Sequence, residues 1–218
     1  MKKRLVIAID GPAGAGKSTI SKEIAKKLDI EYIDTGAMYR ALTLKVLEKG
    51  VNIDDIDKIL DILESSSIYF KNNHIYLDGI NVDKEIRENR ISKYVSDIAK
   101  IKEVRSEMVK LQRQLSKESN VIVDGRDIGT VVLPHANFKF FITASPEVRA
   151  DRRYKELLLK GEKVTYEQVL KEIKTRDKID STREVAPLKK AKDAYEIDTT
   201  NMTIQEVVNK IINIIEGR

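Results

Sequence analysis

The sequence LVIAIDGPAGAGKS at residues 5–18 is the most informative part of the chain. Residues 5–10 form an apolar run that ends at Asp10, which predicts a strand buried on both faces. Residues 11–18 match the phosphate-binding pattern G-x-x-x-x-G-K-[ST], and an amphipathic helical pattern covers residues 17–28. Backbone N–H groups of such a glycine-rich loop surround a triphosphate, and the lysine reaches its β- and γ-phosphates. The stretch therefore predicts a P-loop that binds a nucleoside triphosphate.

Nine consecutive residues are predicted to bind ATP: Gly11, Pro12, Ala13, Gly14, Ala15, Gly16, Lys17, Ser18 and Thr19. Two of them carry neighbouring hydroxyl groups. The motif favours Ser18 as the ligand of Mg²⁺. We expect Thr19 to reach a phosphate oxygen instead.

The rest of the chain alternates short β-rich runs with helical patterns, and this alternation predicts a doubly wound α/β fold. We expect a five-stranded parallel sheet with helices on both faces, placed in a single domain over residues 1–218. The expected strands cover residues 5–10, 31–34, 121–125, 138–144 and 194–200. The expected helices cover residues 17–28, 37–49, 100–117, 146–160 and 204–215. Residues 160–169 contain Gly161 and predict a polar loop followed by a helix.

One segment departs from this alternation. Residues 68–82, IYFKNNHIYLDGINV, contain alternating apolar runs around Asn72 and Asn73, followed by the Asp78–Gly79 pair, which is typical of a hairpin turn. The pattern predicts a small antiparallel β insert. Helical flanks extend the insert to about residues 55–96.

Polar residues follow two of the predicted strands, at the edge where open α/β sheets bind their ligands. Asp124 ends VIVDG, and an acid at that place in a P-loop protein usually orients Mg²⁺, often through water. A turn or helix cap is the alternative role for Asp124. The following Arg126 and Asp127 extend the loop and are suited to contact a second ligand. The run from Asp34 to Arg40 follows the second strand and should face the P-loop.

Composition excludes several classes of site and of location. The chain has no cysteine and two histidines, so disulfides, thiolate metal sites and histidine-rich metal clusters are excluded. No apolar run approaches the roughly 18 residues of a membrane span, and the run at residues 5–9 is too short for a signal peptide. We expect a cytoplasmic protein. A net charge of +5 fits either an anionic partner or a lysine-rich surface.

Five motifs together resemble the bacterial type of the cytidylate kinase family: IDGPAGAGKST, DTGAMYRA, VSDIAKIKEVR, DGRDIGT and TRDKIDSTREVAPL. The resemblance runs from end to end, and the last two motifs make it selective. It implies transfer of the γ-phosphate of ATP to CMP, with dCMP as a second acceptor and Mg²⁺ as cofactor. It also implies that the insert at 55–96 binds the monophosphate and that residues 150–183 form a mobile lid.

The resemblance implies roles for individual residues. The CMP phosphate would be bound by Arg40, Arg126 and Arg183, with Thr35 and Asp180 near the ribose. Cytosine would be read by Ser96, Arg105 and Asp127, which suits its amino donor beside two acceptors. Lid residues would be Arg152, which contacts ATP, together with Arg153 and Arg176. The catalytic residues would be Lys17, Arg126, Arg153 and Arg176. The metal ion would be bound by Ser18 and by Asp124, the latter directly or through water.

Several rival functions are open to a P-loop protein. A kinase for UMP, AMP or shikimate is the nearest, and the DGRD loop and the β insert argue against it. A GTPase should carry an N-K-x-D element, but residues 177–180 read DKID and lack the asparagine. A non-catalytic nucleic-acid binder would explain the net charge of +5 but would not need a complete P-loop beside so many arginines. A non-catalytic P-loop protein that only binds a nucleotide is a further alternative. We expect a monomer, because no exposed apolar stripe is evident.

Overall fold

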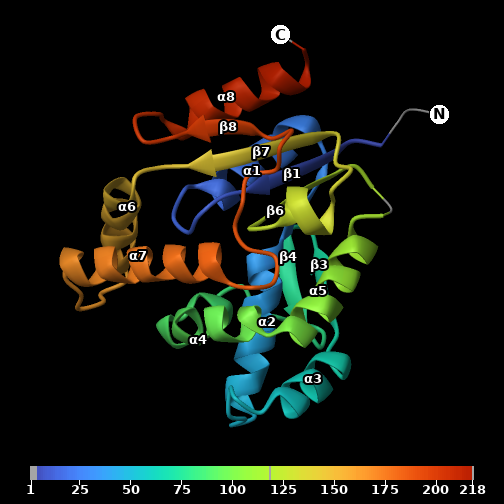
Figure 1. Cartoon of the computed structure of the whole chain (residues 1–218), viewed down its shortest axis with the longest axis vertical. Helices are drawn as coiled ribbons and strands as arrows, with labels where there is room; N and C mark the ends of the chain where they lie inside the picture. The colour runs from blue at the N-terminus through green and yellow to red at the C-terminus, as the bar shows by residue number, and fades with distance from the viewer. Residues whose placement is uncertain (1–3, 118, 218) are drawn as a thin grey trace.

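A computed structural model describes residues 4–117 and 119–217 of the protein. Its centre is a five-stranded sheet of order β2-β6-β1-β7-β8, in which every neighbouring pair is parallel (Figure 1). The sheet confirms the prediction from sequence. Its strands are β1 (Val6–Asp10), β2 (Glu31–Asp34), β6 (Val121–Gly125), β7 (Phe138–Thr143) and β8 (Tyr195–Asp198).

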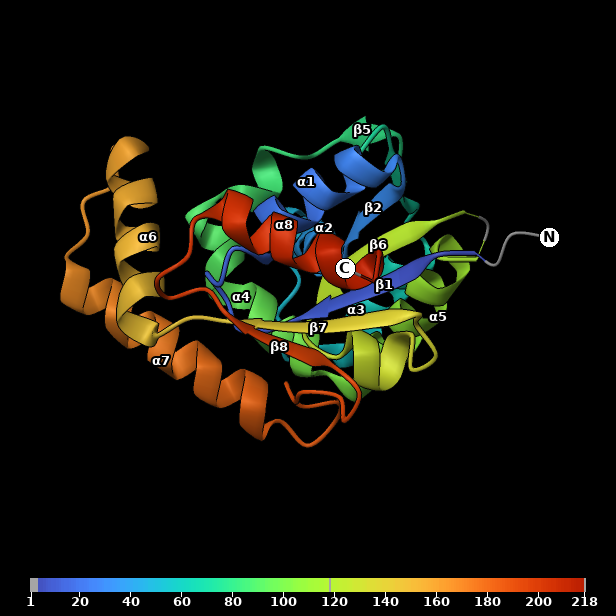
Figure 2. The same cartoon turned by 90° about the horizontal axis from the view of Figure 1, so that it is seen from above.

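Helices cover both faces of this sheet because alternate residues of each buried strand point to opposite sides. Val6 and Ala8 join the core beneath α2 (Thr35–Glu48) and α5 (Lys102–Leu115). Ile7 and Ile9 join the other core, against α1 (Lys17–Leu28) and α8 (Ile204–Ile215). Figure 2 shows α1 and α8 together on one side of β1 and β7. The sheet therefore has an apolar layer on each face.

The predicted β insert forms a separate three-stranded antiparallel sheet of order β3-β4-β5. Both turns have the left-handed backbone that tight hairpins require, since Asn72 and Asn73 have φ of 52° and 62°, and Asp78 and Gly79 have φ of 51° and 85°. The insert shares its apolar core with α2, so it is joined to the sheet rather than set apart. Its elements are α3 (Ile56–Glu64), β3 (Ile68–Lys71), β4 (His74–Leu77), β5 (Ile80–Asn81), η1 (Glu85–Arg87) and α4 (Asn89–Lys100).

The helix pair α6 (Pro146–Leu159) and α7 (Tyr166–Thr182) projects from one end of the sheet (Figures 1 and 2). The side chain of Ser145 accepts from the N–H of Val148 and Pro146 occupies the first turn, which together begin α6. The pair has a small apolar core of its own, formed by Ala150, Leu157, Val169 and Ile173. Few apolar contacts therefore bind it to the rest of the molecule.

Element boundaries and one short helix differ from the predictions. The helix predicted at 37–49 begins at residue 35, because the carboxylate of Asp34 caps it by accepting from the N–H of Ala37 at 2.9 Å. The helix predicted at 100–117 covers 102–115. The π-helix η2 (Ile128–Val132) was not predicted. It begins where the carboxylate of Asp10 accepts from the N–H groups of Ile128 and Gly129, both at 2.7 Å.

None of the helices in the described residues is both long enough and apolar enough to cross a membrane.

Candidate active site

A cavity of about 1090 Å³ opens at the carboxyl ends of the central strands. It is bounded by the P-loop, the start of α2, α4 and the pair α6–α7, so it lies where parallel α/β sheets bind ligands. Nine lysine or arginine side chains and five acidic ones line it, which favours anionic ligands. The predicted site residues among its lining are Ala13, Gly14, Ala15, Gly16, Lys17, Ser18, Thr19, Arg40, Ser96, Asp124, Arg126, Arg152, Arg153 and Arg176. Those outside its lining are Gly11, Pro12, Thr35, Arg105, Asp127, Asp180 and Arg183.

The P-loop wraps around the ammonium group of Lys17. Gly14 and Gly16 adopt left-handed conformations with φ of 77° and 87°, and Gly16 precedes the first turn of α1. The Nζ of Lys17 donates to the carbonyl of Pro12 at 2.8 Å, and the side chain is 6% exposed. Burial, followed by the charge of Arg126, lowers the pKa of Lys17 to about 7. An anion bound in the loop would oppose that effect.

Asp124 lies beside Ser18 at the end of β6. The Ser18 hydroxyl donates to one carboxylate oxygen at 2.8 Å, and the Tyr32 hydroxyl donates to the other at 3.1 Å. Burial and the nearby charge of Asp34 raise the pKa of Asp124. Adjacent oxygen ligands in an octahedral Mg²⁺ site lie about 3 Å apart, so Ser18 and Asp124 fit neighbouring positions around that ion. Tyr32 was missed by the sequence analysis, although its inward position in EYID is the kind of signal that could have revealed it.

Thr35 is buried behind this acid and does not line the cavity. Its hydroxyl donates to the backbone carbonyl of Asp124 at 2.7 Å and so joins the start of α2 to the end of β6. A Cβ on Gly125 would lie 2.6 Å from that hydroxyl oxygen and 2.6 Å from the Cδ1 of Ile128. The close packing of α2, β6 and η2 around Asp124 thus depends on a glycine at residue 125.

Gly125→Ala should lower the free energy of unfolding by about 2 kcal/mol, the usual scale of overpacking in a core. Urea denaturation checks this value. Thr35→Ala removes one of the two groups in conflict, so the double variant should lose less than the sum of the two single variants. Additive losses would show that the conflict lies only with Ile128.

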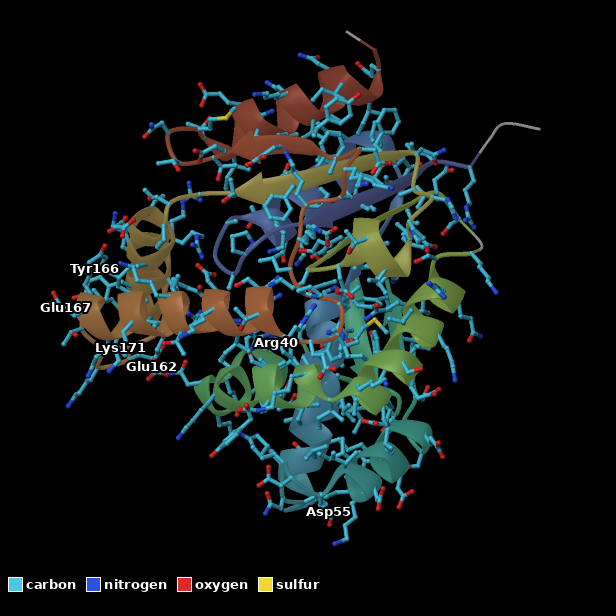
Figure 3. All side chains as sticks on the ribbon, in the orientation of Figure 1. Arg40, Asp55, Glu162, Tyr166, Glu167 and Lys171 are labelled. Carbon is cyan, nitrogen blue, oxygen red and sulfur yellow. The ribbon has the colours of Figure 1, made fainter. Side chains whose placement is uncertain are left out.

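Four arginines, Arg40, Arg126, Arg153 and Arg176, gather opposite the P-loop. The Nε of Arg126 donates to Asp180 at 2.8 Å, and an NH group of Arg40 donates to the Ser92 hydroxyl at 2.9 Å. Arg40 lies on α2 and is labelled in Figure 3. Ser92 is a neighbour that the sequence analysis did not identify.

Arg176 is the least satisfied member of this arginine cluster. In the described part of the chain its Nε is buried without a hydrogen-bond partner. Burial, then the charges of Arg126 and Arg40, lower the pKa of Arg176 to about 9. Burial also lowers the pKa of Arg40, to about 10. The positive charges of these arginines therefore repel one another, and a bound anion would reduce that repulsion.

Two of the three residues predicted to read cytosine, Arg105 and Asp127, lie together outside the cavity lining. Arg105 and Asp127 form a buried ion pair, and Arg183 approaches the other oxygen of Asp127 at 3.5 Å. Ser96 lines the cavity itself from α4. Arg183 also donates to the carbonyl of Ala186 at 2.7 Å, so it is already held in place.

The remaining lid arginines have partners at the surface of the cavity. Arg152 donates to the carbonyl of Thr199 at 3.0 Å and thereby links α6 to the segment after β8. Arg153 pairs with Glu156 on the same helix at 2.8 Å.

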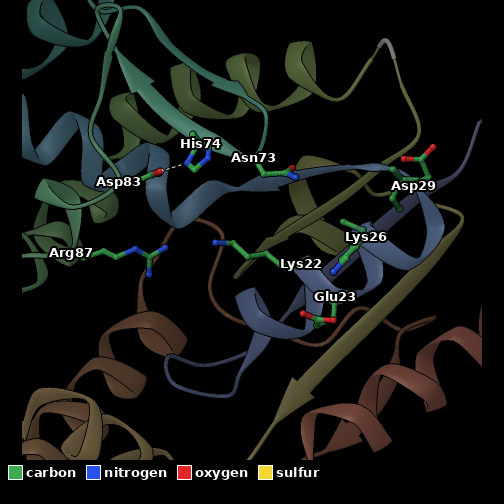
Figure 4. A pocket seen from close by; sticks show the side chains of 10 residues that line it. Lys22, Glu23, Lys26, Asp29, Asn73, His74, Asp83 and Arg87 are labelled. Carbon is green, nitrogen blue, oxygen red and sulfur yellow. Dashed lines mark hydrogen bonds and ion pairs between the residues drawn. The ribbon is translucent and has the colours of Figure 1, made fainter. Parts of the chain in front are cut away.

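A second cavity, of about 670 Å³, lies between α1 and the β insert (Figure 4). His74 contacts Asp83 there at 2.5 Å. The lysines and arginine of its lining, Lys22, Lys26 and Arg87, are equal in number to the acidic residues Glu23, Asp29 and Asp83. The excess of positive charge distinguishes the first cavity as the candidate active site.

Solved structures share the overall fold of this chain. An uncharacterised protein from Eubacterium ventriosum superimposes with a TM-score of 0.51 at 18% identity, covering 99% of this chain and 100% of that one. A sugar kinase from Janibacter sp. superimposes with a TM-score of 0.50 at 11% identity, covering 98% and 95%. At these identities the likeness concerns the fold alone.

The amino-acid sequence of this chain is much more similar to those of proteins named cytidylate kinase. That of Clostridioides difficile is 56% identical over 96% of this chain and 97% of its own length. That of Clostridium tetani is 54% identical over 98% and 95%. The cytidylate kinase family itself matches residues 7–217. The chain therefore belongs to the cytidylate kinase family, as the resemblance of its motifs implied.

Proposed function

We propose that this protein transfers the γ-phosphate of ATP to CMP, giving ADP and CDP, and accepts dCMP as a second substrate. The observation that carries the proposal is the arginine cluster facing the P-loop, in which the Nε of Arg176 is unpartnered among the described residues. A kinase acting on a monophosphate must hold two phosphate groups close together, and this cavity offers cations for both. Family membership supplies the identity of the acceptor.

ATP binds at the P-loop in this proposal, with Lys17 at the transferred phosphate and Arg152 near the nucleotide. Ser18 and Asp124 hold Mg²⁺, directly or through water, because their oxygens lie 2.8 Å apart and Mg²⁺ prefers such ligands. Mg²⁺ held by these two residues would supply positive charge that stabilises the phosphates during transfer. Lys17 is placed to add to this effect from the protein side.

The monophosphate lies between the insert and the arginine cluster. Arg40, Arg126 and Arg183 bind its phosphate, and Arg40 is within reach because α2 begins at the cavity. We assign the ribose contacts to Thr35 and Asp180, which lie behind the cavity lining. Thr35 donates its proton to a backbone carbonyl but keeps lone pairs that can accept from a sugar hydroxyl.

Transfer itself rests on positioning and on charge. The acceptor is already an anion near neutral pH, so no general base is required. Arg126, Arg153 and Arg176 stabilise the transferring phosphoryl group after residues 150–183 close as a lid over the insert at about 55–96. The separate apolar core of α6 and α7 supports movement of that pair as a unit. We also propose a cytoplasmic monomer without a nucleic-acid partner, to be checked by its mass in solution.

Radiometric transfer from ATP to CMP, dCMP, UMP, AMP and shikimate tests the proposal directly. We expect the highest kcat/KM with CMP or dCMP. Preference for UMP or AMP would reassign the substrate within the same reaction. ATP binding without transfer to any acceptor would indicate a nucleotide-binding protein instead.

Asp127→Asn should lower the preference for CMP over UMP by about tenfold, measured as the ratio of the two kcat/KM values. The carboxylate of Asp127 can only accept, which suits the amino group of cytosine and opposes the carbonyl of uracil. An amide can present either a donor or an acceptor. Arg105 holds the carboxylate by a buried ion pair, so Arg105→Lys is the matched test of how that acid is oriented. An unchanged ratio in Asp127→Asn would shift base selection to Ser96 and Arg105.

A further inference from the structure

Arg149, near the start of α6, connects the end of β7 just before it with two separate segments, the P-loop and α7. Its Nε donates to the carbonyl of Ala144 at the end of β7, at 2.8 Å. One NH group donates to the carbonyl of Ala13 in the P-loop at 3.1 Å. The two terminal nitrogens also form a bidentate pair with Asp177 on α7, at 2.9 and 2.6 Å. With 3% exposure, Arg149 is an interior connection that does not line the candidate active site.

The stem of the same side chain supports the P-loop from beneath. A Cβ added to Gly14 would lie 3.2 Å from the Cβ of Arg149 and 3.7 Å from its Cγ. The loop backbone at residues 13 and 14 is thus in contact with both the stem and the guanidinium of one residue. Arg149 therefore fixes the distance between the start of α6 and the P-loop backbone.

Asp177 directly follows Arg176, whose Nε lacks a partner among the described residues. Successive side chains on a helix point about 100° apart, so fixing Asp177 against Arg149 also fixes the direction of Arg176. Asp180, on the following turn of α7, pairs with Arg126 at 2.8 Å. The carboxyl-terminal half of α7 is therefore held at two points, whereas Tyr166 and Glu167 lie at its far end (Figure 3).

We propose that Arg149 and Asp177 are positioning residues that set the place of Arg176 relative to the P-loop. The proposal rests on the proposed phosphoryl transfer. Neither Arg149 nor Asp177 contacts a substrate in this proposal. The guanidinium of Arg149 connects α7 to Ala13, and the two residues affect the transferring phosphoryl group only through the position of Arg176. Lysine at residue 149 keeps the charge but cannot serve three acceptors in one plane. A small misplacement of a catalytic group is enough to slow a reaction severalfold or more.

The experiment compares Arg149→Lys and the milder Asp177→Asn, which keeps the shape of the acid, with the parent. The control is Lys174→Gln, because Lys174 also joins α7 to α6, through Glu147 at 3.3 Å, but is 55% exposed and outside the cavity lining. We expect both test variants to lower kcat about tenfold, with calorimetric ATP and CMP affinities within about threefold of the parent. We expect no change in the control.

A double-mutant comparison with Arg176 distinguishes a positioning role of Arg149 from general support of the fold. Arg176→Lys should have a smaller effect on kcat in the Arg149→Lys background than in the parent, because Arg176 is already displaced there. Hydrogen exchange of the amides in residues 174–182 should speed up in both test variants and stay unchanged in the control. Additive effects on kcat, or unchanged exchange, would overturn the proposal. So would a kcat within twofold of the parent.

An error in the proposed function would be distinguishable from an error in this positioning proposal. A parent that does not phosphorylate CMP would overturn that function, whatever the variants do. The coupling is then measured with the acceptor that the parent does use, and hydrogen exchange reports on the Arg149–Asp177 connection without any acceptor.

Discussion

Lys17→Ala lowers the rate of phosphoryl transfer at least about a hundredfold, the scale on which one preorganised electrostatic contact contributes to a transition state. The structure gives two reasons. The Nζ is fixed by the Pro12 carbonyl at 2.8 Å, so little reorganisation is needed when charge develops on the phosphoryl group. It is also buried, and charges interact more strongly where water is excluded. Steady-state kinetics measure the loss, and a variant with near-normal turnover would remove Lys17 from the mechanism.

The lowered pKa of Lys17 also predicts that ATP binding is coupled to proton uptake. The pKa of Lys17 is lowered to about 7 in the free protein, chiefly by burial, so part of the population is neutral at and above that pH. A bound triphosphate favours the charged form and raises this pKa. ATP binding should therefore take up protons above pH 7, and its affinity should fall as the pH rises further. Calorimetry in two buffers of different ionisation enthalpy measures the uptake, which should disappear in Lys17→Ala.

The sequence predicts the parts of this site that depend on local pattern. The apolar runs of β1 and β6, the P-loop and the hairpin turns of the insert are each specified by residues a few positions apart. The end of β6 places Asp124 beside the P-loop because parallel strands that pair in register end at the same edge. Ser18 and Asp124 are 106 residues apart in the chain, yet their meeting follows from the topology.

The parts that could not be predicted depend on contacts across the fold. Tyr32 reaches Asp124 across 92 residues, and Arg149 reaches Ala13 across 136. Neither has a motif of its own, since a tyrosine in a strand and an arginine in a helix are common as plain packing. The start of α2 was placed two residues late because Asp34 and Thr35 can both cap a helix. Only the packed structure directs the Thr35 hydroxyl to β6 instead.

Arg176→Lys should lower kcat by about tenfold to a hundredfold while weakening ATP and CMP binding much less. An open lid contacts bound substrates weakly, so a residue carried by the lid acts mainly after closure. The substitution keeps the charge but loses the planar fork that can hold two phosphate oxygens at once. Arg153→Lys should have a smaller effect, because Arg153 already pairs with Glu156 at the surface. Kinetics on both variants, together with calorimetric ATP affinity, provide the measurement.

Stability gives an independent check on the role of Arg176. In the free protein the Nε of Arg176 is buried, and the nearby charges of Arg126 and Arg40 add to burial in lowering its pKa to about 9. A cation held there against repulsion costs folding free energy, and residues retained at such a cost are typical of functional sites. Arg176→Gln should therefore raise the free energy of unfolding, by about 1 kcal/mol or more, while abolishing most of the activity. A structural arginine would show the reverse, with stability lost and turnover kept. If urea denaturation shows a loss of stability and kcat of Arg176→Lys stays within about twofold of the parent, Arg176 supports the lid and takes no part in transfer.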